Sequence, residues 1–231
     1  MKIILFGATG MVGQGVLREC LLDPDVEQVL SIGRNATGKQ HEKLRELIRK
    51  DMFNYADIEN DLRGYDACFF CLGVSSVGMK EPDYRRLTYD LTVAAAEPLA
   101  RLNPQMTFIY VSGTGTDSTE KGRSMWARVK GATENALLRL FPAAYMFRPG
   151  LIEPMHGEAP KKGAARALYA IASPLMPLLT RIFPNQVTTT ERVGRAMLEV
   201  AKHGAPKKLL ESRDINDLAL KYSRQDLAGQ K

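Results

Sequence analysis

KIILFGATGMVG, residues 2–13, decides the fold that we expect for this chain. Its first five residues form a short, mostly apolar run, which is typical of a buried β-strand. Glycines follow at positions 7, 10 and 13, and apolar residues then recur at helical spacing until Asp23-Pro24. Because proline cannot continue the hydrogen-bond ladder of a helix, the helix is expected to end there. The segment therefore predicts a strand, a glycine-rich turn and an amphipathic helix in succession.

Each glycine of this turn has a separate physical role in our interpretation. Gly7 permits a tight turn, Gly10 lets a pyrophosphate approach bare backbone, and Gly13 lets the helix pack closely on the strand. Free N–H groups at the start of the helix, together with the positive end of its dipole, would hold the anion. A glycine-rich turn that merely packs well is the alternative, but the position between a strand and a helix favours a phosphate site.

Strand-like and helix-like segments alternate through much of the remaining chain. The central strands are almost continuously apolar, as strands are when both faces of a parallel sheet are covered. Repeated strand–helix units predict an α/β fold with a doubly wound parallel sheet. The expected strands are residues 2–6, 26–32, 44–49, 66–72, 106–111 and 143–147, and the expected helices are residues 55–62, 83–101 (with a kink or an early end at Pro98) and 125–140.

The pattern changes after Gly150. We expect residues 1–150 to form the sheet-containing core and residues 151–231 to form a small C-terminal lobe packed on the same domain. In this lobe we expect a helix over 191–202, opened by Thr188 through its capping-box spacing to Glu191, and an edge strand over 207–211.

Residues 161–183 form an apolar stretch that is flanked by basic residues and interrupted by prolines. We interpret it as a helix that forms the core of the lobe. A membrane-surface helix or a subunit contact in a homo-oligomer is the alternative.

Composition limits the class of protein. Of the 231 residues, 45% are hydrophobic and 25% are charged, which is typical of a soluble globular protein. The net charge of +6 suits an anionic ligand, but the basic residues lack interleaved aromatics, so nucleic acid is not an expected partner. No uncharged stretch reaches the about 20 residues that cross a bilayer. Three cysteines cannot all pair within one chain, which favours a reducing compartment, and we expect a cytoplasmic protein without stable membrane insertion.

Cys68 and Cys71 match a C-x-x-C pattern. Positions three apart on a strand point to opposite faces, so the two sulfur atoms are not expected to converge. Because no histidine or second cysteine pair completes a zinc site, we predict core packing and no metal.

The residues after the second expected strand bear on the choice of cofactor. Dinucleotide folds that prefer NAD usually carry an acidic residue there, which binds the ribose hydroxyls. This chain has Ser31-Ile32-Gly33-Arg34-Asn35 instead. An arginine can form a forked pair with a 2′-phosphate and stack on adenine, so we expect NADP, with NAD less favoured. A solvated surface arginine is the alternative.

Several of these features together resemble one family. With the glycine turn, Arg34, Cys71-Leu72-Gly73 and Phe147-Arg148-Pro149-Gly150, the chain resembles the atypical short-chain dehydrogenase/reductases of the NAD(P)-binding Rossmann superfamily. The likeness is to the mammalian Tat-interactive oxidoreductase-like family and to epimerase/dehydratase-like proteins, and it covers nearly the whole chain. The contacts it implies are Gly7, Thr9, Gly10, Met11 and Val12 with the pyrophosphate, Arg34 and Asp51 with the adenosine end, Cys71, Leu72 and Gly73 with the ribose, and Pro149 with the nicotinamide.

The catalytic groups of that family are a serine and a Tyr-x-x-x-Lys pair. By the resemblance, Ser112 orients the substrate and Lys130 binds a ribose hydroxyl and lowers the pKa of the tyrosine. Here the chain departs from the pattern, because Trp126 stands four residues before Lys130. An indole N–H cannot relay a proton at neutral pH, so we interpret Trp126 as an aromatic wall. Tyr84 or Tyr89 is the alternative source of a hydroxyl.

We therefore expect an NADP(H)-binding oxidoreductase-like protein that, if catalytic, transfers hydride to a small carbonyl or enone substrate. A non-catalytic module whose NADP(H) occupancy regulates a partner is the alternative, and Trp126 favours it. A nucleotide-sugar epimerase-like enzyme is a third hypothesis, which is weaker because such enzymes also need the missing tyrosine.

Overall fold

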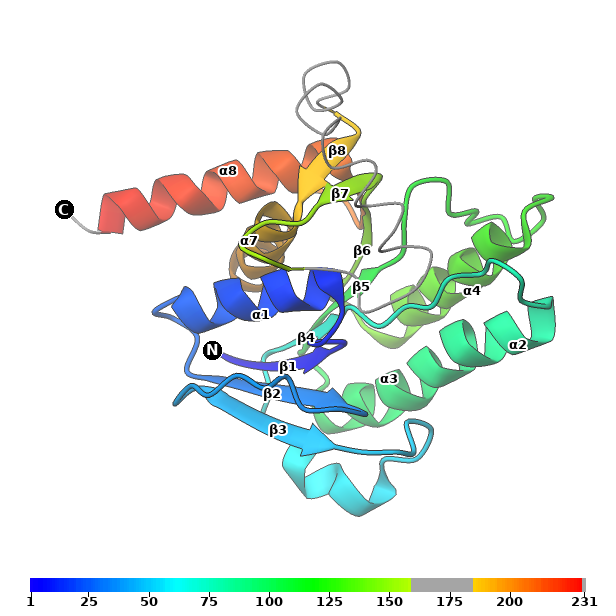
Figure 1. Cartoon of the computed structure of the whole chain (residues 1–231), viewed down its shortest axis with the longest axis horizontal. Coiled ribbons are helices and arrows are strands. Elements are labelled where there is room, and N and C mark those ends of the chain that lie inside the picture. The colour runs from blue at the N-terminus through cyan, green and yellow to red at the C-terminus, as the bar shows by residue number, and fades with distance from the viewer. Residues whose placement is uncertain (159–184, 230–231) are drawn as a thin grey trace.

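A computed structural model describes residues 1–158 and 185–229 of the chain. Over these residues, seven strands form one sheet in the order β3-β2-β1-β4-β5-β6-β9, and every neighbouring pair is parallel. This arrangement confirms the predicted doubly wound Rossmann fold (Figure 1). The strands are β1 (Lys2–Phe6), β2 (Gln28–Gly33), β3 (Leu44–Ile48), β4 (Ala67–Phe70), β5 (Thr107–Val111), β6 (Ala144–Arg148) and β9 (Leu209–Glu211).

Helices cover both faces of the sheet (Figure 1). The long helix predicted over 83–101 begins at Glu81 and contains a π-helical turn. It runs through Pro98 without an early end, because the residues around the proline (Ala95, Ala96 and Leu99) are buried against the sheet. The segment predicted as a helix over 55–62 is a tighter 3₁₀ helix. The helices are α1 (Met11–Leu22), η1 (Ala56–Leu62), α2 (Glu81–Arg85), η2 (Arg86–Asp90), α3 (Leu91–Leu102), α4 (Met125–Leu140), α7 (Thr190–His203) and α8 (Ser212–Gly229).

Two hydrophobic cores lie on the two faces of the sheet. Along β1, Ile3 and Leu5 point into the core under α1, α7 and α8, whereas Ile4 and Phe6 point into the core under η1, α3 and α4. All four side chains are fully buried, which is why this strand is apolar without alternation. Cys68 and Cys71 divide between the same two cores, so the prediction that their sulfur atoms do not converge is confirmed.

Helix α7 begins at Thr190, one residue before the predicted start at Glu191, but its N-cap lies one position after the Thr188 that the capping-box pattern predicted. The residue that caps it is Thr189, whose hydroxyl accepts a hydrogen bond from the backbone N–H of Arg192 at 3.0 Å. Thr188 is fully buried in the adjoining strand β8 (Val187–Thr189). Strand alternation therefore directs Thr188 into the core and leaves the next threonine to cap the helix.

The chain after residue 150 is closely joined to the sheet. Strand β9 pairs with β6, and β7 (Leu151–Glu153) pairs with β8 in a separate two-stranded sheet. Helix α7 packs on α1, where a Cβ on Gly15 would lie 2.6 Å from the Cβ of Thr190 and one on Gly194 would lie 2.8 Å from the Cγ of Glu19. The helix predicted over 161–183 lies outside the described residues, and the domain division at residue 150 stays a prediction.

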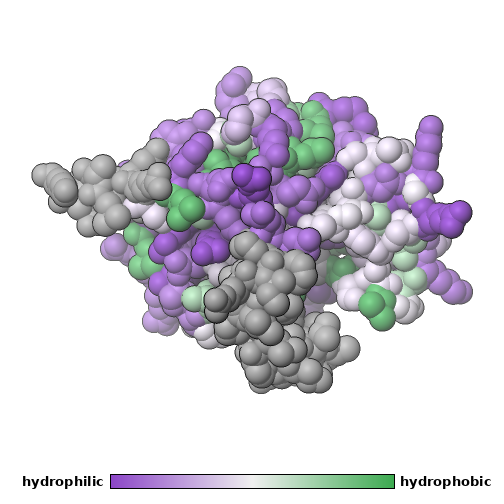
Figure 2. Space-filling model, turned by 90° about the horizontal axis from the view of Figure 1, so that it is seen from above, coloured by the Kyte–Doolittle hydropathy of each residue, from purple (hydrophilic) through white to green (hydrophobic). Residues whose placement is uncertain are grey.

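No helix in the parts of the chain that the structure describes is both long enough and apolar enough to cross a membrane. The face shown in Figure 2 carries mainly hydrophilic side chains, with hydrophobic ones in separate patches.

Candidate functional site

The turn over residues 7–13 joins β1 to α1 at the point where the strand order reverses between β1 and β4. Gly7 has a φ of +83°, and a Cβ there would lie 2.7 Å from the backbone carbon of Cys71. A Cβ on Gly13 would lie 2.0 Å from the carbonyl oxygen of Gly7. Both positions therefore require glycine, and the turn is held against the end of the neighbouring strand.

The start of α1 suits an anion. Gly10 is the N-cap residue; its backbone is extended, and no side chain caps the helix in the described structure. The first turn of α1 contains no acidic residue. The first N–H groups of a helix have no partner within the helix, and the helix dipole adds partial positive charge there. The cradle that the three glycines leave open therefore fits a phosphate or pyrophosphate group.

Two hollows lie at the carboxyl ends of the strands, and they share Leu72 and Gly73. The narrow pocket, of about 170 Å³, lies beyond β2 and β3; the wide cleft, of about 580 Å³, lies beyond β4, β5 and β6. Together they form one groove across the switch point, where ligands of such folds bind. The narrow pocket is lined by Gly33, Arg34, Lys50, Met52, Phe53, Leu72, Gly73, Val74, Leu87 and Leu91, and the wide cleft by Gly10, Met11, Val12, Cys71, Leu72, Gly73, Val111, Ser112, Gly113, Thr114, Trp126, Lys130, Pro149, Gly150 and Ile152.

The narrow pocket has a cationic end. Arg34 and Lys50 are both exposed and both line it, and none of its described lining residues is acidic. Asp51 does not line it; its carboxylate accepts a hydrogen bond from the backbone N–H of Phe53 at 2.8 Å. Phe53 is 37% exposed at the mouth of the pocket, with the guanidinium of Arg86 5.4 Å from its ring centre.

A buried polar network lies beneath the wide cleft. The hydroxyl of Ser112 lies 2.5 Å from Oε1 of Glu134 and 3.1 Å from the carbonyl oxygen of Phe147, and it donates to these acceptors. Glu134 is fully buried and also accepts hydrogen bonds from the guanidinium of Arg148, including one of 3.0 Å from Nε. The Ser112 hydroxyl is thus hydrogen-bonded to the buried carboxylate of Glu134 and does not point its hydrogen into the cleft.

Lys130 and Cys71 have perturbed pKa values in the wide cleft. The ammonium of Lys130 donates a hydrogen bond to the carbonyl oxygen of Ser112. Burial lowers the pKa of Lys130 to about 8, although the negative charge of Glu134 acts in the opposite direction. Burial raises the pKa of the Cys71 thiol to about 12, so this thiol stays protonated.

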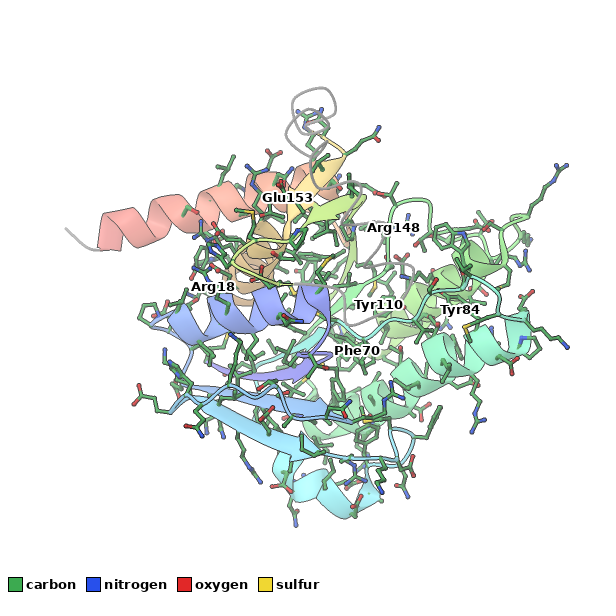
Figure 3. The ribbon with its side chains drawn as sticks, in the orientation of Figure 1. Arg18, Phe70, Tyr84, Tyr110, Arg148 and Glu153 are labelled. Atoms are coloured by element: carbon green, nitrogen blue, oxygen red, sulfur yellow. The ribbon has the colours of Figure 1, made fainter. Side chains whose placement is uncertain are left out.

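Trp126 forms one wall of the wide cleft, as its position in the sequence predicted. Its ring lies 3.4 Å from where a Cβ of Gly115 would stand, so the missing side chain gives the indole room. The two tyrosines considered as substitutes are elsewhere. Tyr84 is 1% exposed and interacts with the buried Tyr110 (Figure 3), and Tyr89 lies under the guanidinium of Arg85 at 4.2 Å.

Two groups of this site were missed by the sequence analysis. Lys50 lies two residues after the end of β3, and it was open to the same argument as Arg34. Glu134 lies four residues after Lys130 on α4, which placed both on one helix face. The partner of Glu134, however, comes from the far end of β6, and helical spacing carries no information on that contact.

Comparison with known proteins gives distant relatives and a well-populated fold. No family model matches the chain. A fungal protein of Meyerozyma guilliermondii, named Protein FMP52, mitochondrial, is 26% identical over 96% of this chain and 97% of its own length. The fmp52 protein of Emericella nidulans is 28% identical over 71% of this chain and 73% of its own.

These relatives contradict the cytoplasmic location that the cysteine content led us to expect. Both are named as mitochondrial proteins, and so is a third, fmp52-2 of Aspergillus oryzae. Free cysteines indicate a reducing compartment and do not distinguish between the compartments that share this property.

Solved structures confirm the fold. The Bordetella bronchiseptica enzyme WbmF in complex with NAD⁺ has a TM-score of 0.67 at 15% identity, over 96% of this chain and 77% of that one. UDP-glucose 4-epimerase of Thermotoga maritima, with UDP-glucose, has a TM-score of 0.68 at 14% identity, over 97% and 82%. The oxidoreductase ylbE of Lactococcus lactis has a TM-score of 0.63 at 15% identity, over 97% of both chains. At these identities the likeness establishes the Rossmann-like architecture alone.

Proposed function

We propose that this protein is an NADP(H)-dependent oxidoreductase that transfers hydride to a small carbonyl or enone substrate. One observation carries the proposal. A continuous groove crosses the carboxyl ends of the strands, with an anion-binding turn on its floor, a cationic pocket at one end and a cleft containing Lys130 and Trp126 at the other. Structural neighbours with bound nicotinamide dinucleotides support the choice of ligand, since WbmF is seen with NAD⁺ and with NADH.

The residues of the groove define how the chain would hold the dinucleotide. The turn of Gly7, Thr9, Gly10, Met11, Val12 and Gly13 would hold the pyrophosphate through backbone N–H groups. Cys71 of the wide cleft would lie along the ribose together with Leu72 and Gly73, which both hollows share, and Pro149 would border the nicotinamide. When bound, the reduced nicotinamide supplies the hydride. Apolar groups at this end, among them Trp126 and Ile152, would keep water from the reacting atoms.

Arg34 and Lys50 carry the preference for NADP. Two exposed cations at the ends of neighbouring strands, with no carboxylate in the described lining of the pocket, suit a 2′-phosphate better than a ribose hydroxyl. Phe53 is placed to stack on adenine, and Asp51 would hold the turn that presents it.

Arg34→Ala is the direct test of this preference. The substitution should weaken NADPH binding by about 1–3 kcal/mol, the worth of a charge-assisted hydrogen bond, which is about 5- to 150-fold in Kd. NADH lacks the phosphate, so its affinity should be unchanged. Isothermal titration of both dinucleotides measures the two values.

Arg63→Ala is the matched control, because Arg63 is an exposed arginine that does not line the groove. It should leave both affinities as they are. An equal loss of NADPH and NADH affinity in Arg34→Ala would remove the NADP assignment.

A non-catalytic NADP(H)-sensing module is the second candidate. It is favoured by the absence of a tyrosine from the described lining of the wide cleft and by the engagement of the Ser112 hydroxyl with Glu134. The two candidates differ in the fate of NADPH. An oxidoreductase should consume NADPH in the presence of 4-nitrobenzaldehyde or 9,10-phenanthrenequinone, as absorbance at the nicotinamide band would show, whereas a sensor should bind NADPH and leave it unchanged.

A further inference from the structure

We propose that Lys130 is the acid that protonates the substrate oxygen in this protein, the task that a tyrosine performs in the family the sequence resembles. The inference rests on the proposed hydride transfer and assigns its missing proton donor. It follows from the chemistry of the side chains that surround the wide cleft.

Most proton-bearing side chains in the described lining of the cleft are unsuitable. Trp126 carries an indole N–H, which does not ionise near neutral pH. The Cys71 thiol is buried and, with its raised pKa, releases its proton only in strong alkali. The side chains of Cys71 and Trp126 can therefore line the cleft without exchanging a proton with a bound substrate.

The two hydroxyl groups of the lining already donate their hydrogen atoms to protein acceptors. Ser112 donates within the buried network, to Glu134 at 2.5 Å or to the carbonyl oxygen of Phe147 at 3.1 Å. Thr114 donates to the carbonyl oxygen of Arg148 at 3.1 Å. A hydroxyl carries a single hydrogen atom, so neither group can give one to a substrate without first breaking these contacts.

Lys130 has protons to give. Its ammonium carries three N–H groups, and the carbonyl oxygen of Ser112 accepts from it. Within the described residues this is the only hydrogen bond of the ammonium, so further N–H groups remain at the wall of the cleft.

The surroundings of Lys130 make its proton transferable near neutral pH. The titratable and charged groups on the packed elements are Glu134 on its own helix, Arg148 on β6, Tyr110 on β5 and Cys71 after β4. Glu134 forms an ion pair with Arg148, which offsets most of its negative charge. Burial is therefore the larger of the two effects on the pKa of Lys130. A pKa of about 8 gives both the charged and the neutral amine at working pH, which general acid catalysis requires.

With a reduced nicotinamide bound in the groove, hydride and its electron pair would be delivered to the carbonyl carbon; the π bond of C=O would break, and the oxygen would become an alkoxide. The alkoxide takes a proton from Lys130, so one N–H bond breaks and one O–H bond forms. The carbonyl is reduced to an alcohol, the dinucleotide is oxidised, and the neutral amine of Lys130 recovers its proton from water.

Lys130→Arg separates proton donation from cofactor binding. Arginine keeps the positive charge and the N–H donors but does not release a proton. NADPH affinity should stay within about threefold of that of the wild type, while reduction of 9,10-phenanthrenequinone at saturating NADPH should fall by about 10²–10⁴-fold. Reduction by Lys130→Arg at near the wild-type rate would overturn the proposal while the proposed function stood. No NADPH binding by the wild type would overturn the proposed function first, and the proton role with it.

A second measurement needs neither cofactor nor turnover. The cofactor-free protein is treated with a trace of acetic anhydride at a series of pH values, and acetylation of Lys130 is followed by peptide mass spectrometry, with exposed Lys39 as the reference in the same sample. Lys130 should reach half its maximal reactivity near pH 8, below the ordinary range of a lysine side chain. A midpoint at or above that of Lys39 would show that the amine stays charged at working pH, which contradicts the proposed role.

Discussion

Gly13→Ala is expected to abolish dinucleotide binding and to destabilise the fold by about 3 kcal/mol, the upper end of the usual cost of overpacking. The added Cβ would stand 2.0 Å from the carbonyl oxygen and 2.6 Å from the carbonyl carbon of Gly7. Both are backbone atoms of the turn, and they cannot move aside as the end of a side chain can. Either α1 moves away from β1 or the turn opens, and both changes displace the N–H groups that would bind the pyrophosphate.

Urea denaturation followed by circular dichroism measures the stability, and titration with NADPH measures the binding. Gly73→Ala is the matched control for stability, since a Cβ at Gly73 meets open space. It should leave the unfolding midpoint unchanged, although Gly73 lines the groove and can affect binding. NADPH binding by Gly13→Ala within threefold of the wild type would place the anion elsewhere.

The sequence predicted the strand–turn–helix segment well because the determinants are local. The positions of Gly7, Gly10 and Gly13 follow from the backbone of one turn, and the buried run of β1 follows from coverage of both its faces. Most of the expected groove residues line the two hollows at the ends of β1, β2, β4, β5 and β6, and Lys130 joins them from α4. Gly7, Thr9 and Gly13 shape the turn without lining either hollow, and Asp51 turns its carboxylate to the backbone of Phe53.

The parts that sequence reasoning missed depend on contacts between distant segments. The capping threonine of α7 was misplaced by one residue because the pairing of β8 with β7, which buries Thr188, has no local signal. Glu134 drew no attention because its partner, Arg148, reaches it only through the parallel pairing of β5 with β6. The side chains that fix the polar network are thus set by sheet topology.

Glu134→Gln should destabilise the protein by about 3–5 kcal/mol, although glutamine keeps the shape of the side chain. Glu134 is fully buried, and the side chain of Arg148 is 11% exposed, so the substitution leaves a charge in a medium that solvates it poorly. Glu211, whose Oε1 lies 3.8 Å from a guanidinium nitrogen of Arg148, offers only partial compensation. Urea denaturation at pH 7 gives the change in the free energy of unfolding.

Two variants isolate the cause. Glu59→Gln breaks the exposed ion pair with Arg101, whose side chain is 59% exposed, and should change the free energy of unfolding far less than Glu134→Gln does. Glu134→Gln combined with Arg148→Met removes the stranded charge and should recover part of the lost stability. A double variant less stable than Glu134→Gln alone would show that Arg148 stabilises the fold by other contacts.

The same substitution tests the link between the network and Lys130. The negative charge of Glu134 raises the pKa of Lys130 against the effect of burial, so its removal should lower that pKa further. In Glu134→Gln the acetylation midpoint of Lys130 should therefore shift to lower pH, and the alkaline limb of any reductase activity, along which Lys130 loses its proton, should shift with it. An unchanged midpoint would mean that Arg148 already cancels the charge of Glu134 at Lys130, leaving burial alone to set how readily the cleft gives up a proton.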